Sequence, residues 1–320
     1  MSRSFAPISE RVFPVGEELT ESWTVTERTI PFRTYETWIR ISEPNTPRPD
    51  ALPVVVLHGG PGMAHNYMLP FERLAAAGRT VIHYDQLGCG NSTHLPDSPA
   101  EFWTPDLFVE EFFNLAASLG LDEFHVLGQS WGGMLAAEIA VRQPAALRSV
   151  SILNSPASMA LWVQAAAELR LKLPAGMNET MSKYEAAGKT NDAEYLSCVD
   201  EFYRRHVCRV EPTPKEFVDS TKQMEAEPTV YHTMNGPNEF HVIGSLKDWS
   251  IVEELPKVNR PTLVLAGEYD EATPATWTPF VNKISDVRSV VIDGASHCAH
   301  LEQPAVVLRI VNDFLADHDS

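Results

Sequence analysis

The chain has few cysteines, no long apolar run and few basic residues for its length of 320 residues. Its four cysteines are scattered and form no CxxC or Cys/His pattern with metal-ligand spacing, so we expect reduced thiols and no zinc site. No stretch approaches the roughly 18 consecutive apolar residues of a membrane span, and residues 1–19 lack the apolar core of a signal peptide. These absences predict a cytoplasmic protein without a membrane partner.

The charge balance is acidic, because 25 Lys and Arg stand against 43 Asp and Glu and give a formal net charge of -18. Binding to a phosphate backbone requires a basic surface, so nucleic acid is not expected as a partner. A hydrophobic content of 44% and a mean hydropathy of -0.17 are typical of packed, water-soluble proteins. The length allows one large domain or a core with an insertion.

Short apolar runs alternate with amphipathic stretches such as residues 106–119 and 133–142, as in a doubly wound α/β sheet. An alternating pattern at residues 23–30 and 35–41 predicts an antiparallel hairpin at the sheet edge. We therefore predict a mostly parallel, eight-stranded sheet with helices on both faces. The expected parallel strands are residues 54–58, 81–85, 124–127, 150–153, 262–266 and 289–292.

Between about residues 157 and 250 the alternation stops, and helix-like segments dominate. Strand-like patterning returns at Arg260, so this helical segment is inserted between the sixth and the seventh strand. We predict a core made of residues 1–156 and 251–320 and a helical cap domain made of residues 157–250. The clearest helical segments of the cap are residues 159–173, 193–207 and 214–225.

The candidate nucleophile is Ser130, in the sequence GQSWG at residues 128–132. This sequence fits GxSxG and lies between an expected strand and an expected helix, where a nucleophile elbow requires small flanking residues. A second glycine-rich turn, HGGPG at residues 58–62, also follows a strand and can bring a backbone N–H to the site. We assign the oxyanion donors to the backbone of Gly60 and Trp131, with His58 bracing the loop.

A serine nucleophile needs a base and an acid, and in this type of fold the chain order is serine, acid, histidine. The loop after the strand at 262–266 offers Asp270, with Glu268 and Glu271 as alternatives that we interpret as solvated carboxylates. The loop after the last expected strand contains His297, which we favour over His300 as the base. The other histidines lack metal spacing, so no metal and no cofactor are implied.

The whole set of motifs resembles the α/β-hydrolase superfamily, and within it the proline iminopeptidase family of serine peptidases and its L-amino-acid amide hydrolases. Two cap stretches, at residues 202–212 and 228–251, resemble the branch that acts on L-prolinamide. The motifs that carry the resemblance are HGGPG (58–62), YDQLGCGNS (84–92), GQSWGG (128–133), MNGPNEF (234–240), GEYDEATP (267–274) and the histidine loop at His297.

The resemblance implies that carboxylates of the cap bind the free α-amino group of the substrate. The matching positions are Glu239 and, with a looser alignment, Glu211. A buried ammonium needs a charge partner, which gives this assignment an independent chemical reason. Two apolar cap residues, Trp162 and Phe240, could affect the substrate range, although ordinary packing is their simpler interpretation.

The leading hypothesis is a serine hydrolase that cleaves the amide bond after an unblocked N-terminal L-amino acid, proline or a small apolar residue. Its substrate would be a small amino-acid amide or a short peptide. Two alternatives stay open, because triad and fold do not select the leaving group. One is a carboxyl-ester or lactone hydrolase, and the other is a non-catalytic ligand-binding protein on the same fold. The sequence gives no oligomeric state.

Overall fold

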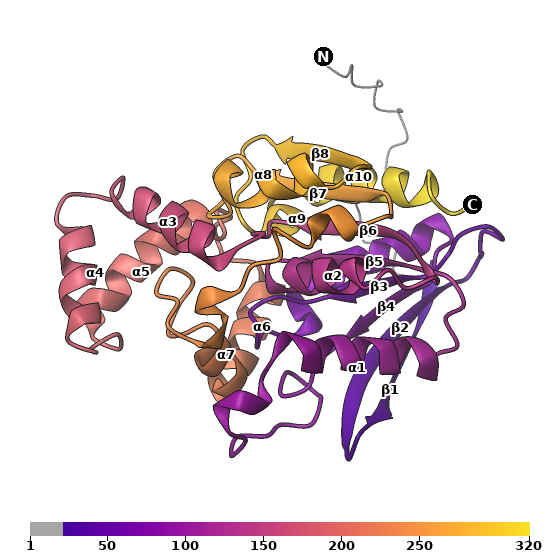
Figure 1. Ribbon diagram of the computed structural model, residues 1–320, viewed down its shortest axis with the longest axis horizontal. Helices are drawn as coiled ribbons and strands as arrows, with labels where there is room; N and C mark the ends of the chain where they lie inside the picture. Colours follow the sequence, from indigo (N-terminus) through magenta and orange to yellow (C-terminus); the bar gives the residue numbers. More distant parts are fainter. Residues whose placement is uncertain (1–21) are drawn as a thin grey trace.

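The computed structural model describes residues 22–320, and the stretch of residues 1–19 considered above lies outside them. A central sheet has the strand order β1-β2-β4-β3-β5-β6-β7-β8 (Figure 1). β2 pairs antiparallel with β1 and β4, and the other neighbours are parallel, which confirms the mostly parallel eight-stranded sheet. The strands are β1 (Trp23–Phe32), β2 (Tyr35–Pro44), β3 (Val54–Leu57), β4 (Val81–Tyr84), β5 (Phe124–Gln129), β6 (Leu147–Leu153), β7 (Thr262–Gly267) and β8 (Val287–Ile292).

Side chains of the central strands alternate between two apolar cores, one on each face of the sheet. In β3, Val55 and Leu57 belong to one core, whereas Val54 and Val56 belong to the other. Every residue of β3 is buried as a result. The double coverage explains why the sequence of this strand is apolar throughout and not alternating.

Helices cover both faces of the sheet (Figure 1). Phe112 of α1 and Phe280 of α8 belong to the first core, and Phe71 of η2 and Phe314 of α10 belong to the second. Within residues 22–320, no helix is long and apolar enough to cross a bilayer. The helices of the core region are η2 (His65–Ala77), η3 (Ala100–Phe102), α1 (Pro105–Ser118), α2 (Trp131–Val141), η5 (Leu255–Lys257), α8 (Pro274–Lys283), α9 (Ala299–Glu302) and α10 (Pro304–Ala316).

A helical region is inserted between β6 and β7, as the sequence predicts, and α3, α4 and α5 project away from the sheet (Figure 1). Its outer part has a small apolar core of its own, which includes Leu169, Met181 and Phe202. Two of its helices, α4 and α7, were not among the segments that the sequence singled out. The helices of this region are α3 (Met159–Arg170), α4 (Met177–Ala186), α5 (Ala193–His206), α6 (Lys215–Ala226), α7 (Thr229–Met234) and η4 (Ser245–Asp248).

The side chain of Asp319 links the C-terminal end of the chain to the sheet through hydrogen bonds. Its carboxylate accepts two hydrogen bonds from the buried guanidinium of Arg79, at 2.7 and 2.8 Å, and one from the N–H of Leu52 at 3.0 Å. His125 of β5 lies 3.1 Å from the same carboxylate. Burial alone would raise the pKa of Asp319, but the hydrogen bonds from His125 and Arg79 hold it well below its usual range.

We expect Asp319→Asn to destabilise the protein by about 3–5 kcal/mol, because the buried charge of Arg79 loses its partner. The lowered pKa of Asp319 means that its contribution is present above the pKa of an unfolded aspartate and is lost as the pH falls. Urea unfolding at pH 7 measures the difference. Asp317→Asn is the control, because Asp317 is exposed. A loss no larger than that of the control would contradict the anchoring role.

Candidate active site

Ser130 lies in the sharp turn between β5 and α2 and has a positive φ of 56°, which is uncommon for a residue with a side chain. The turn is possible because glycines stand two residues before and two residues after Ser130. A Cβ on Gly128 would lie 1.9 Å from the carbonyl oxygen of Gly132, and a Cβ on Gly132 would lie 2.2 Å from that of Leu57. This strained strand-to-helix turn is the geometry of a nucleophile elbow.

His297 and Asp270 form a buried pair next to Ser130. The Nδ1–H of His297 donates to Oδ1 of Asp270 at 2.8 Å, and His297 lines the same cavity as Ser130. The other oxygen of Asp270 accepts a hydrogen bond of 2.6 Å from the side chain of Asn154. Ala272 donates its N–H to Oδ1 at 2.8 Å, so the carboxylate is held in one orientation. Ser130 and His297 line one cavity, and the hydrogen-bonded pair of His297 and Asp270 is what a serine, base and acid triad requires.

Two of the other candidates for acid and base, Glu268 and His300, make different contacts. Glu268 is exposed and accepts a hydrogen bond from the N–H of Gly294, as expected for a solvated loop carboxylate. His300 is buried, its Nε2 contacts the carbonyl oxygen of Tyr67 at 2.9 Å, and its ring stacks on Phe71. Burial lowers the pKa of His300 to about 4. The geometry therefore favours Asp270 and His297.

The electrostatics of His297 suit a general base that is held by an acid. Burial alone would lower the pKa of this imidazole, but the charge of Asp270 and the hydrogen bond to it outweigh the burial. The charge of Glu239 acts in the same direction. The pKa of His297 is therefore raised, because the imidazolium is stabilised by the acidic groups around it.

The HGGPG turn, residues 58–62, brings the backbone of Gly60 to the cavity at Ser130. Gly60 has a φ of +113°, and a Cβ at this position would lie 2.5 Å from the N–H nitrogen of Gly62. Among the described residues, the N–H groups of Gly60 and Trp131 have no hydrogen-bond partner, and both residues line the cavity at Ser130. Burial lowers the pKa of His58 to about 4, so this histidine is neutral and braces the loop.

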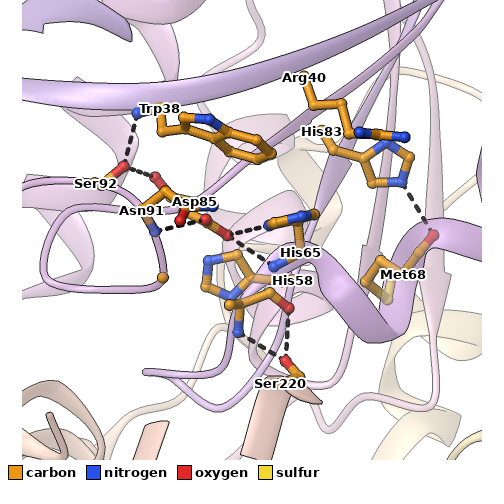
Figure 2. A network of polar contacts seen from close by, with 12 residues as sticks. Trp38, Arg40, His58, His65, Met68, His83, Asp85, Asn91, Ser92 and Ser220 are labelled. Carbon is orange, nitrogen blue, oxygen red and sulfur yellow. Dashed lines mark hydrogen bonds and ion pairs between the residues drawn. The ribbon is translucent and has the colours of Figure 1, made fainter. Parts of the chain in front are cut away.

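The side chain of Gln86 joins the two segments that carry these N–H groups. Its Nε2 donates to the carbonyl oxygen of His58 at 2.9 Å, and its Oε1 accepts from the indole N–H of Trp131 at 2.8 Å. Figure 2 shows how the neighbouring Asp85 is held: it accepts hydrogen bonds from the backbone and ring of His65 and from the N–H of Asn91. No local sequence pattern indicates this bridging role of Gln86.

A second buried acidic group, Glu271, lies beside Glu239. The prediction that Glu271 is solvated is wrong. The residue is 1% exposed, and neither of its carboxylate oxygens has a hydrogen-bond partner among the described residues. Its Oε1 lies 3.8 Å from Nε2 of His297. Burial raises the pKa of Glu271 well above its usual value, and the charges of Glu239 and Asp270 raise it further.

Glu239 accepts a hydrogen bond of 2.7 Å from the hydroxyl of Tyr231, and burial raises its pKa as well. Glu211, by contrast, is exposed and does not line the cavities at Ser130, so the structure does not bring this predicted amine ligand to the site. Phe240 packs on Phe202 inside the cap, at a centroid distance of 4.8 Å. Trp162 does reach the site, with its ring 5.6 Å from that of His297.

Two cavities meet at Ser130, and Gly60 and Glu239 line both of them. The smaller, of about 10 Å³, is formed mainly by Trp131, Met159 and Trp162. The larger, of about 110 Å³, includes His297. No group of three or more His, Cys, Asp or Glu in residues 22–320 could hold a metal ion.

Comparison with known proteins agrees with this geometry. Residues 53–304 match the family model described as alpha/beta hydrolase fold. A proline iminopeptidase of Heyndrickxia coagulans is 36% identical over 264 residues, which are 82% of this chain and 90% of the relative. The chain therefore belongs to the α/β-hydrolase fold family, and within it to the proline iminopeptidase family. The resemblance inferred from the motifs is confirmed.

Two solved structures are more similar still. The crystal structure of a proline iminopeptidase of Mycobacterium smegmatis is 61% identical, with a TM-score of 0.88. The crystal structure of VinJ is 47% identical, also with a TM-score of 0.88. Both similarities cover 92% of this chain and 99% of the other.

We expect Asp270→Asn to lower the pKa of His297. The substitution removes the largest of the charges that raise this pKa and leaves the burial that lowers it. NMR titration of the histidine side chains measures the shift, and the spectrum of His297→Gln identifies the signal. Glu268→Gln, on the exposed part of the same loop, should leave the titration unchanged. An unchanged pKa in Asp270→Asn would contradict the pairing.

Proposed function

We propose that this protein is a serine hydrolase that releases an unblocked N-terminal L-amino acid, proline or a small apolar residue, from an amide or a short peptide. The observation that carries the proposal is that two carboxyl groups, the partly buried Glu239 and the buried Glu271, lie close to His297. A substrate ammonium between them would supply the positive charge that the pair lacks. The names of the relatives support the same activity.

The reaction follows from the placement of the triad. His297 accepts the proton of the Ser130 hydroxyl while the oxygen attacks the substrate carbonyl, and Asp270 holds the imidazolium. The N–H groups of Gly60 and Trp131 stabilise the oxyanion. His297 then donates the proton to the leaving nitrogen, the amide bond breaks, and an acyl-enzyme forms. Water, deprotonated by His297, hydrolyses the ester and regenerates Ser130.

The smaller cavity is suited to the acyl residue of the substrate. Its walls include the rings of Trp131 and Trp162, and because its volume of about 10 Å³ holds no more than about one water molecule, it must widen to receive even a small acyl residue. Trp162 is fixed there because its indole N–H donates to the carbonyl oxygen of Glu239 at 2.6 Å. One segment thus supplies both a wall of this cavity and a carboxylate for the ammonium. This combination supports a small apolar residue with a free amino group.

The placement of the protein in the cytoplasm, and small molecules as its only substrates, belong to the same proposal. All four cysteines are free, which supports a reducing compartment. A carboxyl-ester or lactone hydrolase and a ligand-binding protein remain the competing hypotheses. Neither gives a reason for two carboxyl groups with raised pKa values beside the base.

Turnover of L-prolinamide, N-acetyl-L-prolinamide and a p-nitrophenyl ester tests the proposal. We expect hydrolysis of the unblocked amide, little of the acetylated one, and a loss of about four orders of magnitude or more in kcat for Ser130→Ala. Cleavage of the ester alone would instead support an esterase. A fluorophosphonate that fails to label Ser130 would support the ligand-binding hypothesis.

We expect Glu239→Gln and Glu271→Gln each to lower kcat/KM for L-prolinamide by about 30-fold or more, because a buried ammonium loses a charge partner worth about 2 kcal/mol or more. Steady-state kinetics at pH 7 measure the loss.

Glu268→Gln is the matched control, since Glu268 is an exposed glutamate three residues before Glu271. If both buried variants kept the kcat/KM of this control, the amine-binding role would be wrong. Normal labelling of the variants by a fluorophosphonate would show that the triad itself is intact.

A further inference from the structure

The larger cavity at Ser130 has a different chemical character from the smaller one. Its walls beyond the triad are apolar or uncharged and come from the HGGPG region, the end of α5 and helix α6. Apart from Glu239 and His297, no side chain of residues 22–320 that lines it carries a carboxylate, an imidazole, an amine or a guanidinium. These walls include Met63, Tyr67, Val207, Phe217, Thr221 and Met224.

Helix α6 presents its uncharged face to this cavity. Phe217, Thr221 and Met224 are spaced by four and three residues, so they lie on one side of the helix. The charged residues of the helix lie elsewhere: Lys215 pairs with Asp219, and Lys222 is exposed. The helix is fixed to the core because the Ser220 hydroxyl bonds with the N–H and carbonyl of Ala64, at 3.0 and 2.8 Å; Figure 2 shows Ser220 in place.

The position of His297 decides which part of the substrate enters this cavity. In amide hydrolysis the base returns its proton to the leaving nitrogen, so the leaving group must lie on the side of the histidine. His297 lines the larger cavity and does not line the smaller one. Trp131, whose N–H is assigned to the oxyanion, lines the smaller one.

We propose that the larger cavity is a subsite for an uncharged, apolar leaving amine. Its volume of about 110 Å³ is close to that of an apolar cavity of ~150 Å³ that holds a benzene ring. The leaving group of a dipeptide carries a carboxylate, and among the described residues no lysine or arginine lines this cavity to receive it. The carboxylate would also lie near Glu239, at a like-charge cost. The preferred substrates are therefore aminoacyl derivatives of apolar amines and not free dipeptides.

This inference rests on the proposed function, and the test separates the two. Three substrates share the prolyl group and differ in the leaving group: L-prolinamide, L-prolyl-L-leucinamide and L-prolyl-L-leucine. For the wild-type protein we expect kcat/KM to be at least 10-fold higher for the leucinamide than for the free dipeptide. Equal values for these two would overturn the inference, whereas failure on all three would overturn the proposed function.

Met224→Lys tests the location of the subsite. A cation in the cavity should lower kcat/KM for L-prolyl-L-leucinamide at least 10-fold. It should also reduce the ratio of kcat/KM for the leucinamide to that for the free dipeptide. Prolinamide releases only ammonia and does not fill the cavity, so its kcat/KM should change less than 3-fold.

Lys222→Met is the matched control, on the exposed side of the same helix, and should leave all three values unchanged. Phe217→Ser is a second, uncharged variant in case the lysine disturbs folding, and should reduce only the leucinamide rate. If Met224→Lys and Phe217→Ser both kept the wild-type ratio between leucinamide and prolinamide, the subsite would not lie here.

Discussion

The concentration of buried acidic groups around one histidine is the constraint on which the site depends. Asp270 and Glu271 are buried, Glu239 is partly buried, and all three act on His297. Burial disfavours the charged form of a carboxyl group, and like charges disfavour it further. Burial therefore raises the pKa values of Glu239 and Glu271, and the substrate ammonium is the missing charge partner in our proposal.

The cap and the core meet at the backbone of the two catalytic loops. The carbonyl oxygen of His206, at the end of α5, accepts hydrogen bonds from the N–H of Glu271 at 3.3 Å and of His297 at 3.1 Å. That of Val207 accepts from Cys298 at 2.9 Å. The inserted region thus holds the acid loop and the histidine loop directly. It also contributes Glu239 and part of the walls of both cavities. In our proposal, the inserted region therefore affects both substrate selection and the geometry of the acid and histidine loops.

The sequence predicts the parts of this structure that local patterns encode. Buried parallel strands are apolar throughout, and Ser130 has the glycines that its strained turn requires. The predictions for Glu271 and Glu211 fail for one physical reason: the burial of a loop carboxylate depends on what packs over it. Glu271 is polar and follows Asp270 in a loop, so nothing local shows that the cap covers it. Glu211 lies in a cap segment that resembles the family, yet its side chain faces solvent.

Proton release on ligand binding tests the central claim most directly. Burial raises the pKa values of Glu239 and Glu271, and an incoming ammonium should lower them, so binding should release protons. Calorimetric titration of Ser130→Ala with L-prolinamide, in buffers of different ionisation enthalpy near pH 7, measures the protons exchanged. The account predicts net release with L-prolinamide and no binding of N-acetyl-L-prolinamide. Equal binding of the two ligands, without proton release, would contradict it.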